Sequence, residues 1–317
     1  SIAKGKVGRV LSTVLTHSPK EYIKTLKDFP DAVIIGRVST PQIYLLQKFL
    51  RKRKVKVIFD LDDAIFLPTS KLFGINVRPG SFCIEILSKL ADFVTVNGHY
   101  LLSYVRTLNE RSAIIHDPIN CKLFSPELKD DYDKVTIGWE GSARSHYGNL
   151  AMLVKPLKRV ARKYDIRFEV VSYLGDIRIK RMFKKLEKFI EVDYGSDSWL
   201  PLNEFAKLIS DFDIMVAPLQ KTPWYEGKSA LRVGIGMAMS IPVVASPVGE
   251  QKYVIKHGIN GFLATDEKEW YEYLKMLIED SKLRKYMGSS GRKTAEKKLS
   301  SRACGKKLFD ILNRLLQ

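Results

Sequence analysis

Short, continuously apolar runs recur along the chain and alternate with longer segments of helical periodicity. Runs that lack an in-and-out alternation are typical of strands buried on both faces of a parallel sheet. We predict strands at 31–36, 55–60, 92–97, 112–117, 134–139, 167–172, 189–194, 212–218, 241–246 and 261–264. Predicted helices between them include 41–54, 83–91, 150–164, 179–189 and 202–210. This order predicts an α/β fold with doubly wound, Rossmann-like domains.

The chain divides at residues 116–134, a stretch with two prolines, an acidic patch and no long apolar run. A length of 317 residues fits two domains, because a domain usually holds about 150 residues. We expect an N-terminal domain over 1–125 and a C-terminal domain over 126–296, facing each other across a cleft. Residues 297–317 are predicted to form a helix that packs on the N-terminal domain.

Two expectations concern the ends of the chain. The region after residue 264 is predicted to be helical to the end, with a break at "GSSGR" (288–292). The first residue is Ser1 and not Met, so we allow for a trimmed start that lacks a first strand.

The chain is strongly basic, with 53 lysines and arginines against 35 aspartates and glutamates, a formal net charge of +18. Such an excess attracts polyanions. The stretches 48–56 and 177–188 place basic residues on or near helices with apolar positions between them, a pattern that rests on anionic membrane surfaces. The alternative is a solvated basic face. No nucleic-acid-binding module accompanies the charge, so nucleic acid is not an expected partner.

The three cysteines lie far apart, as a reducing cytosol permits. No apolar run reaches the roughly 18 residues that a membrane span needs. We therefore expect a cytoplasmic protein that touches the inner face of the membrane peripherally. The five histidines show no metal-ligand spacing, and we predict no metal site.

The segment "GKSALRVGIGMAMSIPVVASPVG" (227–249) combines a loop, a helix and a buried strand. Ser229 is the expected N-cap of the helix. Lys228 lies at the helix start, and Arg232 lies on the same face as Ser229. A helix N-terminus attracts anions, so the two basic residues could clamp a diphosphate and stabilise it as a leaving group. The alternative is a surface lysine and arginine beside a packing helix.

This segment and its flanks resemble the nucleotide-sugar-binding half of GT-B glycosyltransferases, specifically retaining family 4. The shared features, in the family's order, are Trp224, Gly227, Lys228, Arg232 in place of a lysine, Met237, Ala238, "PVVASPVG", "HGINGFL", Glu269, Trp270, "LIED", "LRKYMG" and "SGR". "IGWEGSARSHYGNL" (137–150) resembles the first strand and Gly-Ser loop of the same domain. "VIFDLDDAIF" (57–66) resembles a stretch of the N-terminal domain in one branch.

The resemblance implies a hexosyltransferase-like enzyme with two GT-B domains. It would move a sugar from a nucleotide-sugar donor to a glycan, lipid-linked or other hydroxyl acceptor, with retention and with neither metal nor cofactor. The C-terminal domain would bind the donor and the N-terminal domain the acceptor. The implied donor-binding residues are Gly141, Ser142, Arg144, Lys228, Ser229, Arg232, Val248 and Gly249. The implied catalytic residues are Lys228, Arg232, Asp60 and Asp62.

Two departures from the family's pattern leave alternatives open. The family's paired glutamates correspond here to Gly227 and Ile235, and an isoleucine cannot accept a hydrogen bond from the ribose. Ser240 replaces a small glycine. One alternative is therefore a non-catalytic GT-B-like binding or partner subunit. Another is a metal-dependent transferase that uses Asp60–Asp63, because an Asp-x-Asp at a strand end also holds divalent cations in GT-A enzymes. A further reading of that cluster is an acidic turn that solvates a loop.

Overall fold

The computed structural model describes residues 10–14, 30–36, 41–67, 70–72, 75–77, 81–126 and 134–317. The chain forms two compact units, each assembled from separate segments. The first unit comprises Ser1–Asp117, Thr222–Ser229 and Cys304–Gln317. The second unit comprises Pro118–Lys221 and Ala230–Ala303. In the described part of the chain, no helix is long and apolar enough to cross a membrane.

The first unit is built on a parallel sheet with the strand order β1-β2-β3-β6-β7. Its strands are β1 (Val10–Val14), β2 (Ala32–Gly36), β3 (Lys56–Leu61), β6 (Phe93–Val96) and β7 (Ser112–Ile114). Its helices are α2 (Pro41–Lys52), α3 (Ser81–Leu90), α4 (His99–Arg106), α9 (Pro223–Glu226) and most of α14 (Ser301–Leu316). A short antiparallel pair, β4 (Ser70–Leu72) and β5 (Ile75–Val77), stands apart from this sheet.

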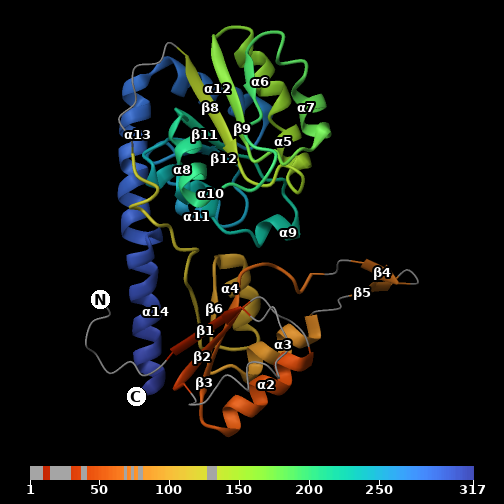
Figure 1. Cartoon of the computed structure of the whole chain (residues 1–317), viewed down its shortest axis with the longest axis vertical. Coiled ribbons are helices and arrows are strands. Elements are labelled where there is room, and N and C mark those ends of the chain that lie inside the picture. Colours follow the sequence, from red (N-terminus) through yellow and green to blue (C-terminus); the bar gives the residue numbers. More distant parts are fainter. Residues whose placement is uncertain are drawn as a thin grey trace. The chain divides into compact units, whose positions relative to one another are not determined.

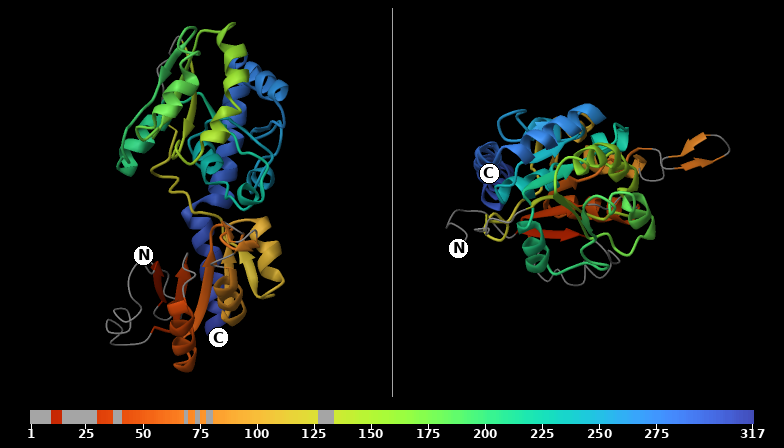
Figure 2. Two further views of the ribbon diagram at one scale, coloured as in Figure 1. Left: turned by 90° about the vertical axis from the view of Figure 1, so that its right-hand side faces the viewer. Right: turned by 90° about the horizontal axis from the view of Figure 1, so that it is seen from above.

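Both faces of this sheet are buried, and strand β3 shows why its sequence is continuously apolar. Val57, Phe59 and Leu61 face the core formed with α2, α3 and α4. Ile58 faces the opposite side, where it packs with Ala32 and with Ile311 and Leu312 of α14. Helix α14 therefore covers one face of the first sheet (Figures 1 and 2).

The second unit is a six-stranded parallel sheet with the order β10-β9-β8-β11-β12-β13. Its strands are β8 (Val135–Glu140), β9 (Ile166–Val171), β10 (Glu191–Asp193), β11 (Ile214–Ala217), β12 (Val243–Ala245) and β13 (Phe262–Leu263). Its helical elements are α5 (Tyr147–Ala151), α6 (Val154–Ala161), α7 (Ile177–Phe183), α8 (Leu202–Ser210), α10 (Leu231–Ala238), α11 (Gln251–Val254), α12 (Glu267–Glu279), α13 (Ser281–Thr294) and the π-helix η1 (Ala295–Leu299). Alternate residues of β11 belong to two separate cores, Ile214 to one and Met215 to the other, so this sheet is also covered on both faces.

The predicted α/β fold with two parallel-sheet domains is confirmed. Each of the ten predicted strands overlaps a strand of the structure, although most are shorter than the apolar runs that predicted them. Strand β1 and the β4–β5 pair were not predicted. The helix predicted over 150–164 is divided into α5 and α6 at Met152 and Leu153.

The predicted break at "GSSGR" is wrong, because α13 runs from Ser281 to Thr294 without interruption. A β-carbon on Gly288 would lie 1.9 Å from the carbonyl oxygen of Ser240, and one on Gly291 would lie 3.1 Å from the Met237 side chain. The glycines therefore permit close packing of α13 and do not mark a turn. The change of direction comes later, at Ser300, which leaves the helical conformation after η1.

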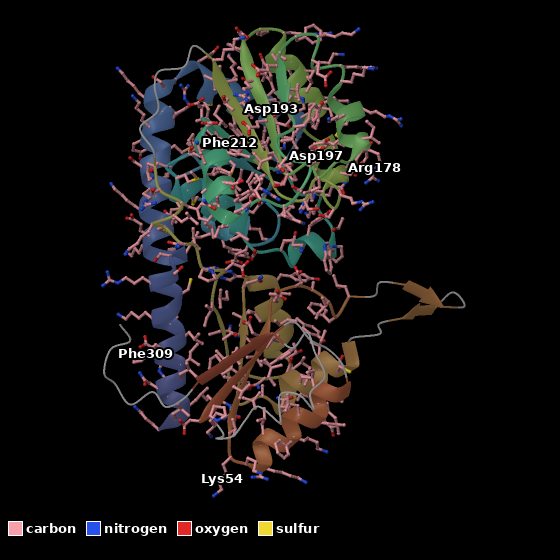
Figure 3. All side chains as sticks on the ribbon, in the orientation of Figure 1. Lys54, Arg178, Asp193, Asp197, Phe212 and Phe309 are labelled. Atoms are coloured by element: carbon pink, nitrogen blue, oxygen red, sulfur yellow. The ribbon has the colours of Figure 1, made fainter. Side chains whose placement is uncertain are left out.

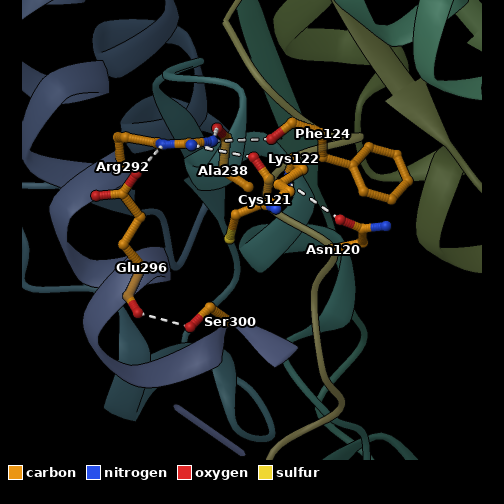
Figure 4. A network of polar contacts seen from close by, with 8 residues as sticks. All are labelled: Asn120, Cys121, Lys122, Phe124, Ala238, Arg292, Glu296 and Ser300. Carbon is orange, nitrogen blue, oxygen red and sulfur yellow. Dashed lines mark hydrogen bonds and ion pairs between the residues drawn. The ribbon is translucent and has the colours of Figure 1, made fainter. Parts of the chain in front are cut away.

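Arg292, the last residue of that motif, fastens the entry segment of the second unit (Figure 4). Its Nη1 donates to the carbonyl oxygen of Phe124 at 2.9 Å and also to that of Ala238, and its Nη2 donates to that of Cys121 at 3.0 Å. Glu296, one turn further on, accepts from Nε at 2.7 Å. A single guanidinium thus ties α13 to the start of the unit, 171 residues earlier.

Candidate functional site

In the first unit, the acidic stretch Asp60–Asp63 lies at the carboxyl end of β3. Asp60 is paired in register with Thr95 of β6, whose Oγ1 donates to Asp60 Oδ1 at 2.5 Å. Asn97 Nδ2 donates to the carbonyl oxygen of Asp62, also at 2.5 Å. Burial raises the pKa of Asp60 to about 6, against the opposing effect of the Thr95 hydrogen bond, and the charges of Asp62 and Asp117 raise it further. The Asp60 carboxyl group therefore keeps its proton to a higher pH than an ordinary aspartate does.

The third aspartate of the stretch holds Lys228. Lys228 Nζ donates to Asp63 Oδ1 at 2.8 Å, and the two side chains are 28% and 15% exposed. The ammonium also lies 4.8 Å from the centre of the Trp224 ring, which supplies a second favourable interaction for a cation. The domain bounds expected from the sequence put Asp63 and Lys228 in different domains, so their pairing was not predicted.

The loop that carries Lys228 is held against the end of β3. Helix α9 is capped by Thr222, whose Oγ1 accepts from the Tyr225 amide at 3.3 Å. Gly227 follows the helix, and a β-carbon there would lie 2.6 Å from the Ala64 β-carbon. The position where the family carries its first glutamate is thus a close packing contact in this chain.

In the second unit, two of the residues predicted for the donor site, Arg232 and Gly141, lie next to each other. Arg232 is the second residue of α10, and its Nε donates to the carbonyl oxygen of Glu140, the last residue of β8, at 2.7 Å. The guanidinium lies 4.9 Å from the Trp139 ring centre. A β-carbon on Gly141 would lie 2.4 Å from Arg232 Nη2, and Gly141 has a φ of +125°, which disfavours other residues.

Glu140 is a site residue that the sequence analysis missed. Its Oε1 lies 3.3 Å from Arg232 Nε, and the side chains of the pair are 9% and 13% exposed, respectively. Burial raises the pKa of Glu140, and the Arg232 charge opposes that rise. Glu140 was visible in "GWEGS" as an acidic residue at the end of an apolar strand, but its partner could not be read from the sequence.

The loop after Gly141 positions the other predicted residues of this unit. Ser142 is half-buried, and its carbonyl oxygen accepts from the Ser145 amide and hydroxyl at 3.2 and 3.0 Å. Arg144 is exposed. Buried Asn149, at the end of the same segment, accepts from the Gln220 amide at 2.9 Å. The loop therefore has internal hydrogen bonds and a link to the segment after β11.

Val248 and Gly249 lie after β12. Val248 is buried, and Gly249 has a φ of +64°, so a glycine is the natural occupant. Gln251, just beyond, donates from Nε2 to the carbonyl oxygens of Ala217 and Ser246 at 3.3 and 3.0 Å. The backbone of this loop is thus held at the carboxyl ends of β11 and β12, where ligands of doubly wound sheets bind.

Two expectations about α10 are changed by the structure. Ser229 is not the N-cap, since α10 begins at Leu231 after Ala230; Ser229 instead ends the segment that belongs to the first unit. Ile235 is 5% exposed and is part of the hydrophobic core, so the position of the family's second glutamate is an interior one here. Ser240 has a φ of +58°, which explains why a glycine suits this position.

No three histidine, cysteine, aspartate or glutamate side chains within the described ranges come close enough together to hold a metal ion. Asp60 and Asp63 are instead engaged by Thr95 and Lys228.

Comparisons with known proteins show what part of the chain is similar to a known family. Residues 134–280 match the family described as Glycosyl transferases group 1. An uncharacterized glycosyltransferase of Methanocaldococcus jannaschii is 27% identical over 229 residues, which make up 70% of this chain and 60% of that relative. The chain thus spans 60% of the length of this curated relative.

Two solved structures share the fold at low sequence identity. Sucrose-phosphate synthase from Thermosynechococcus elongatus gives a TM-score of 0.73 at 15% identity, over 93% of this chain and 76% of that one. Anabaena HepE, solved in complex with UDP, gives a TM-score of 0.69 at 13% identity, over 93% of this chain and 81% of that one. The two parallel-sheet units therefore define a GT-B fold, as predicted. Within it, residues 134–280 match the Glycosyl transferases group 1 family, which confirms the resemblance to this type of enzyme; the assignment to retaining family 4 stays a prediction.

Proposed function

We propose that this protein is a glycosyltransferase that moves a sugar from a nucleotide-sugar donor to a hydroxyl acceptor. The observation that carries the proposal is the placement of Arg232 in the first turn of α10, against Gly141 at the end of β8, within the matched family domain. An arginine at a helix N-terminus and a strand end is suited to a diphosphate. The UDP bound to the structural neighbour HepE supports a nucleotide of this kind.

In this proposal Arg232 and Lys228 neutralise the charge of the departing nucleoside diphosphate. In the sequence, Lys228 precedes α10 by three residues, and Arg232 is the second residue of this helix. Glu140 holds the Arg232 guanidinium through both its carbonyl oxygen and its carboxylate. Gly141, Ser142, Arg144, Ser229, Val248 and Gly249 complete the proposed donor site. Catalysis would come from positioning and from stabilising the leaving group, which needs no strong side-chain base.

The acceptor is proposed to bind the first unit, at the carboxyl ends of β3 and β6. Asp60 and Asp62 present carboxyl groups there, and Asn97 is a buried neighbour whose Oδ1 has no hydrogen-bond partner among the described residues. A glycan or lipid-linked acceptor offers hydroxyl groups that could donate hydrogen bonds to these carboxylate and amide oxygens. Retention, independence from metal and peripheral contact of 48–56 and 177–188 with anionic membrane are further parts of the proposal.

Ile235 favours one alternative, a non-catalytic GT-B-like binding or partner subunit. Its side chain lies in the core and cannot serve the ribose. Release of the free nucleotide during transfer separates the two functions, because only an enzyme produces it.

The test is a panel of UDP-, GDP-, ADP- and dTDP-sugars added to the full chain. A true donor should raise the melting temperature, because a ligand at 100 times its Kd adds about 2.7 kcal/mol to the free energy of unfolding. Release of nucleotide in the presence of acceptor would then show transfer, and EDTA would show whether a metal is needed. If no nucleotide sugar in the panel shifts the transition, the proposed donor site is wrong.

A further inference from the structure

The second unit contains a pocket of about 750 Å³ beside β9, β10 and α8. Five carboxylates line it, from Glu169, Asp193, Asp197, Glu204 and Asp211. The basic lining residues are Arg167 and Lys207. Figure 3 marks Asp193, at the end of β10, and Asp197, in the loop that follows. A pocket this rich in acids is unexpected in a chain with a net charge of +18, and it lies outside the proposed donor-binding residues.

The acidic charge of the pocket is only partly neutralised from within. Arg167 Nη2 donates to Asp193 Oδ2 at 2.7 Å, and Arg167 Nε lies 3.5 Å from Glu191 Oε1. This arginine is therefore already shared between two carboxylates of β10. Lys207 is the other cation of the lining, and its side chain is exposed on α8.

The buried side chain of Glu169 is stronger evidence for a ligand than the number of carboxylates. It is 2% exposed, it lines the pocket, and its Oε2 has no hydrogen-bond partner within the described part of the chain. Burial raises its pKa to about 7, against the nearby charge of Arg167, while Asp193, Asp211 and Glu191 raise it further. A buried carboxyl oxygen without a partner is costly. A cationic hydrogen-bond donor in the pocket would remove that cost.

The spacing of the carboxylates selects the kind of cation. They surround the pocket and do not converge, since no three of the described acidic, histidine or cysteine side chains come together as metal ligands. Leu200 and Leu208 add apolar surface to the same lining. A ligand with several ammonium groups separated by methylene segments would meet both features. We propose that this pocket binds a linear aliphatic polyamine, with one ammonium group on Glu169.

Calorimetric titration of spermidine into the full chain tests the proposal. Because the protein is strongly positive, loose surface binding of a polycation is disfavoured, and a saturable one-to-one association would report the pocket. Glu169→Gln should weaken binding at least about ten-fold, because it removes a charge-assisted hydrogen bond. The matched control is Asp165→Asn, which removes an exposed carboxylate paired with Lys134 in the same unit; it should bind spermidine like the wild type.

A second variant guards against an effect of Glu169 on folding. Asp197 and Glu204 are exposed lining residues, so Asp197→Asn with Glu204→Gln should also weaken spermidine binding and leave the unfolding transition in place. The proposal is overturned if spermidine does not bind, or if both pocket variants bind it as the wild type does. It is equally overturned if equimolar Mg²⁺ displaces spermidine, or if oligolysine binds where spermidine does not.

Discussion

Lys228 and Asp63 form an ion pair of 2.8 Å between residues 165 positions apart in the sequence. The lysine is the one that the family resemblance assigns to the donor diphosphate, and the aspartate follows Asp60 and Asp62 at the end of β3. A donor phosphate and Asp63 would therefore compete for the same ammonium group. This competition can be measured.

Asp63→Asn is expected to tighten the binding of UDP, used as a probe of the donor site, by several-fold. The substitution removes the negative charge that occupies Lys228 and repels the diphosphate. Calorimetric titration gives the Kd. Weaker UDP binding in the variant would show instead that Asp63 holds Lys228 in its binding position.

Lys228→Ala is expected to reduce sugar transfer by about 10²–10³-fold, the scale on which single groups that stabilise developing charge contribute. Its stability should change by less than about 1 kcal/mol, because the ion pair is partly exposed. Lys256→Ala, which removes an exposed lysine of the second unit, is the control and should transfer normally. Full activity in Lys228→Ala would exclude the lysine from the diphosphate site.

Arg232→Ala is expected to lower the free energy of unfolding by about 3 kcal/mol, because it leaves the buried Glu140 carboxylate without its cation. Activity lost in this variant would therefore mix two effects. Adding Glu140→Gln should recover part of the stability but none of the transfer. Urea unfolding and a transfer assay on both variants distinguish the structural role from the catalytic one; recovery of transfer in the double variant would contradict a role for Arg232 in catalysis.

Asp60 should make stability depend on pH. Its pKa is raised in the folded protein to about 6 from an ordinary value of 3.8, so between these values the folded state holds a proton that the unfolded state has lost. The contribution of Asp60 to stability is therefore present below pH 3.8 and is lost as the pH rises through 6, up to about 3 kcal/mol. Asp60→Asn should flatten this decline between pH 4 and 6.5 in urea unfolding, whereas Asp165→Asn should not. An identical decline in Asp60→Asn would assign it to other groups.

Gly288→Ala and Gly305→Ala form a matched pair of helix substitutions with opposite expected signs. At Gly288 the added methyl group would meet the Ser240 carbonyl oxygen at 1.9 Å, so we expect a loss of about 3 kcal/mol. At Gly305, in α14, nothing lies within 4 Å of the new β-carbon, and alanine should stabilise the helix by about 1 kcal/mol. Thermal unfolding measures both. Equal effects of the two substitutions would contradict the close approach at Gly288.

The sequence predicts the strands of this protein well because burial on both faces leaves a continuous apolar signature. Val57, Ile58 and Phe59 belong in turn to two different cores, so none of them could be polar. The sequence also indicates which basic residues belong to the candidate donor site, because Lys228 and Arg232 stand in a recognisable local motif. Whether they bind a donor stays a prediction.

The partners of these residues could not be predicted, because long-range pairing leaves no local pattern. Glu140 lies 92 positions from Arg232, and nothing near either residue marks the other. The predicted N-cap at Ser229 was also wrong, because α10 begins only at Leu231 and Ser229 ends a segment of the first unit. The break at "GSSGR" failed because glycine serves both turns and close packing, and only the neighbouring Ser240 distinguishes them.

The assembly of the first unit from three segments has a consequence for synthesis on the ribosome. Its parallel sheet is translated well before α14, yet one face of that sheet is covered by Ile311 and Leu312 of this helix. Until α14 has been made, this sheet face must stay exposed or be shielded by a chaperone. Removal of α14 would therefore expose strands that lie far before it in the sequence, and not only its sequence neighbours.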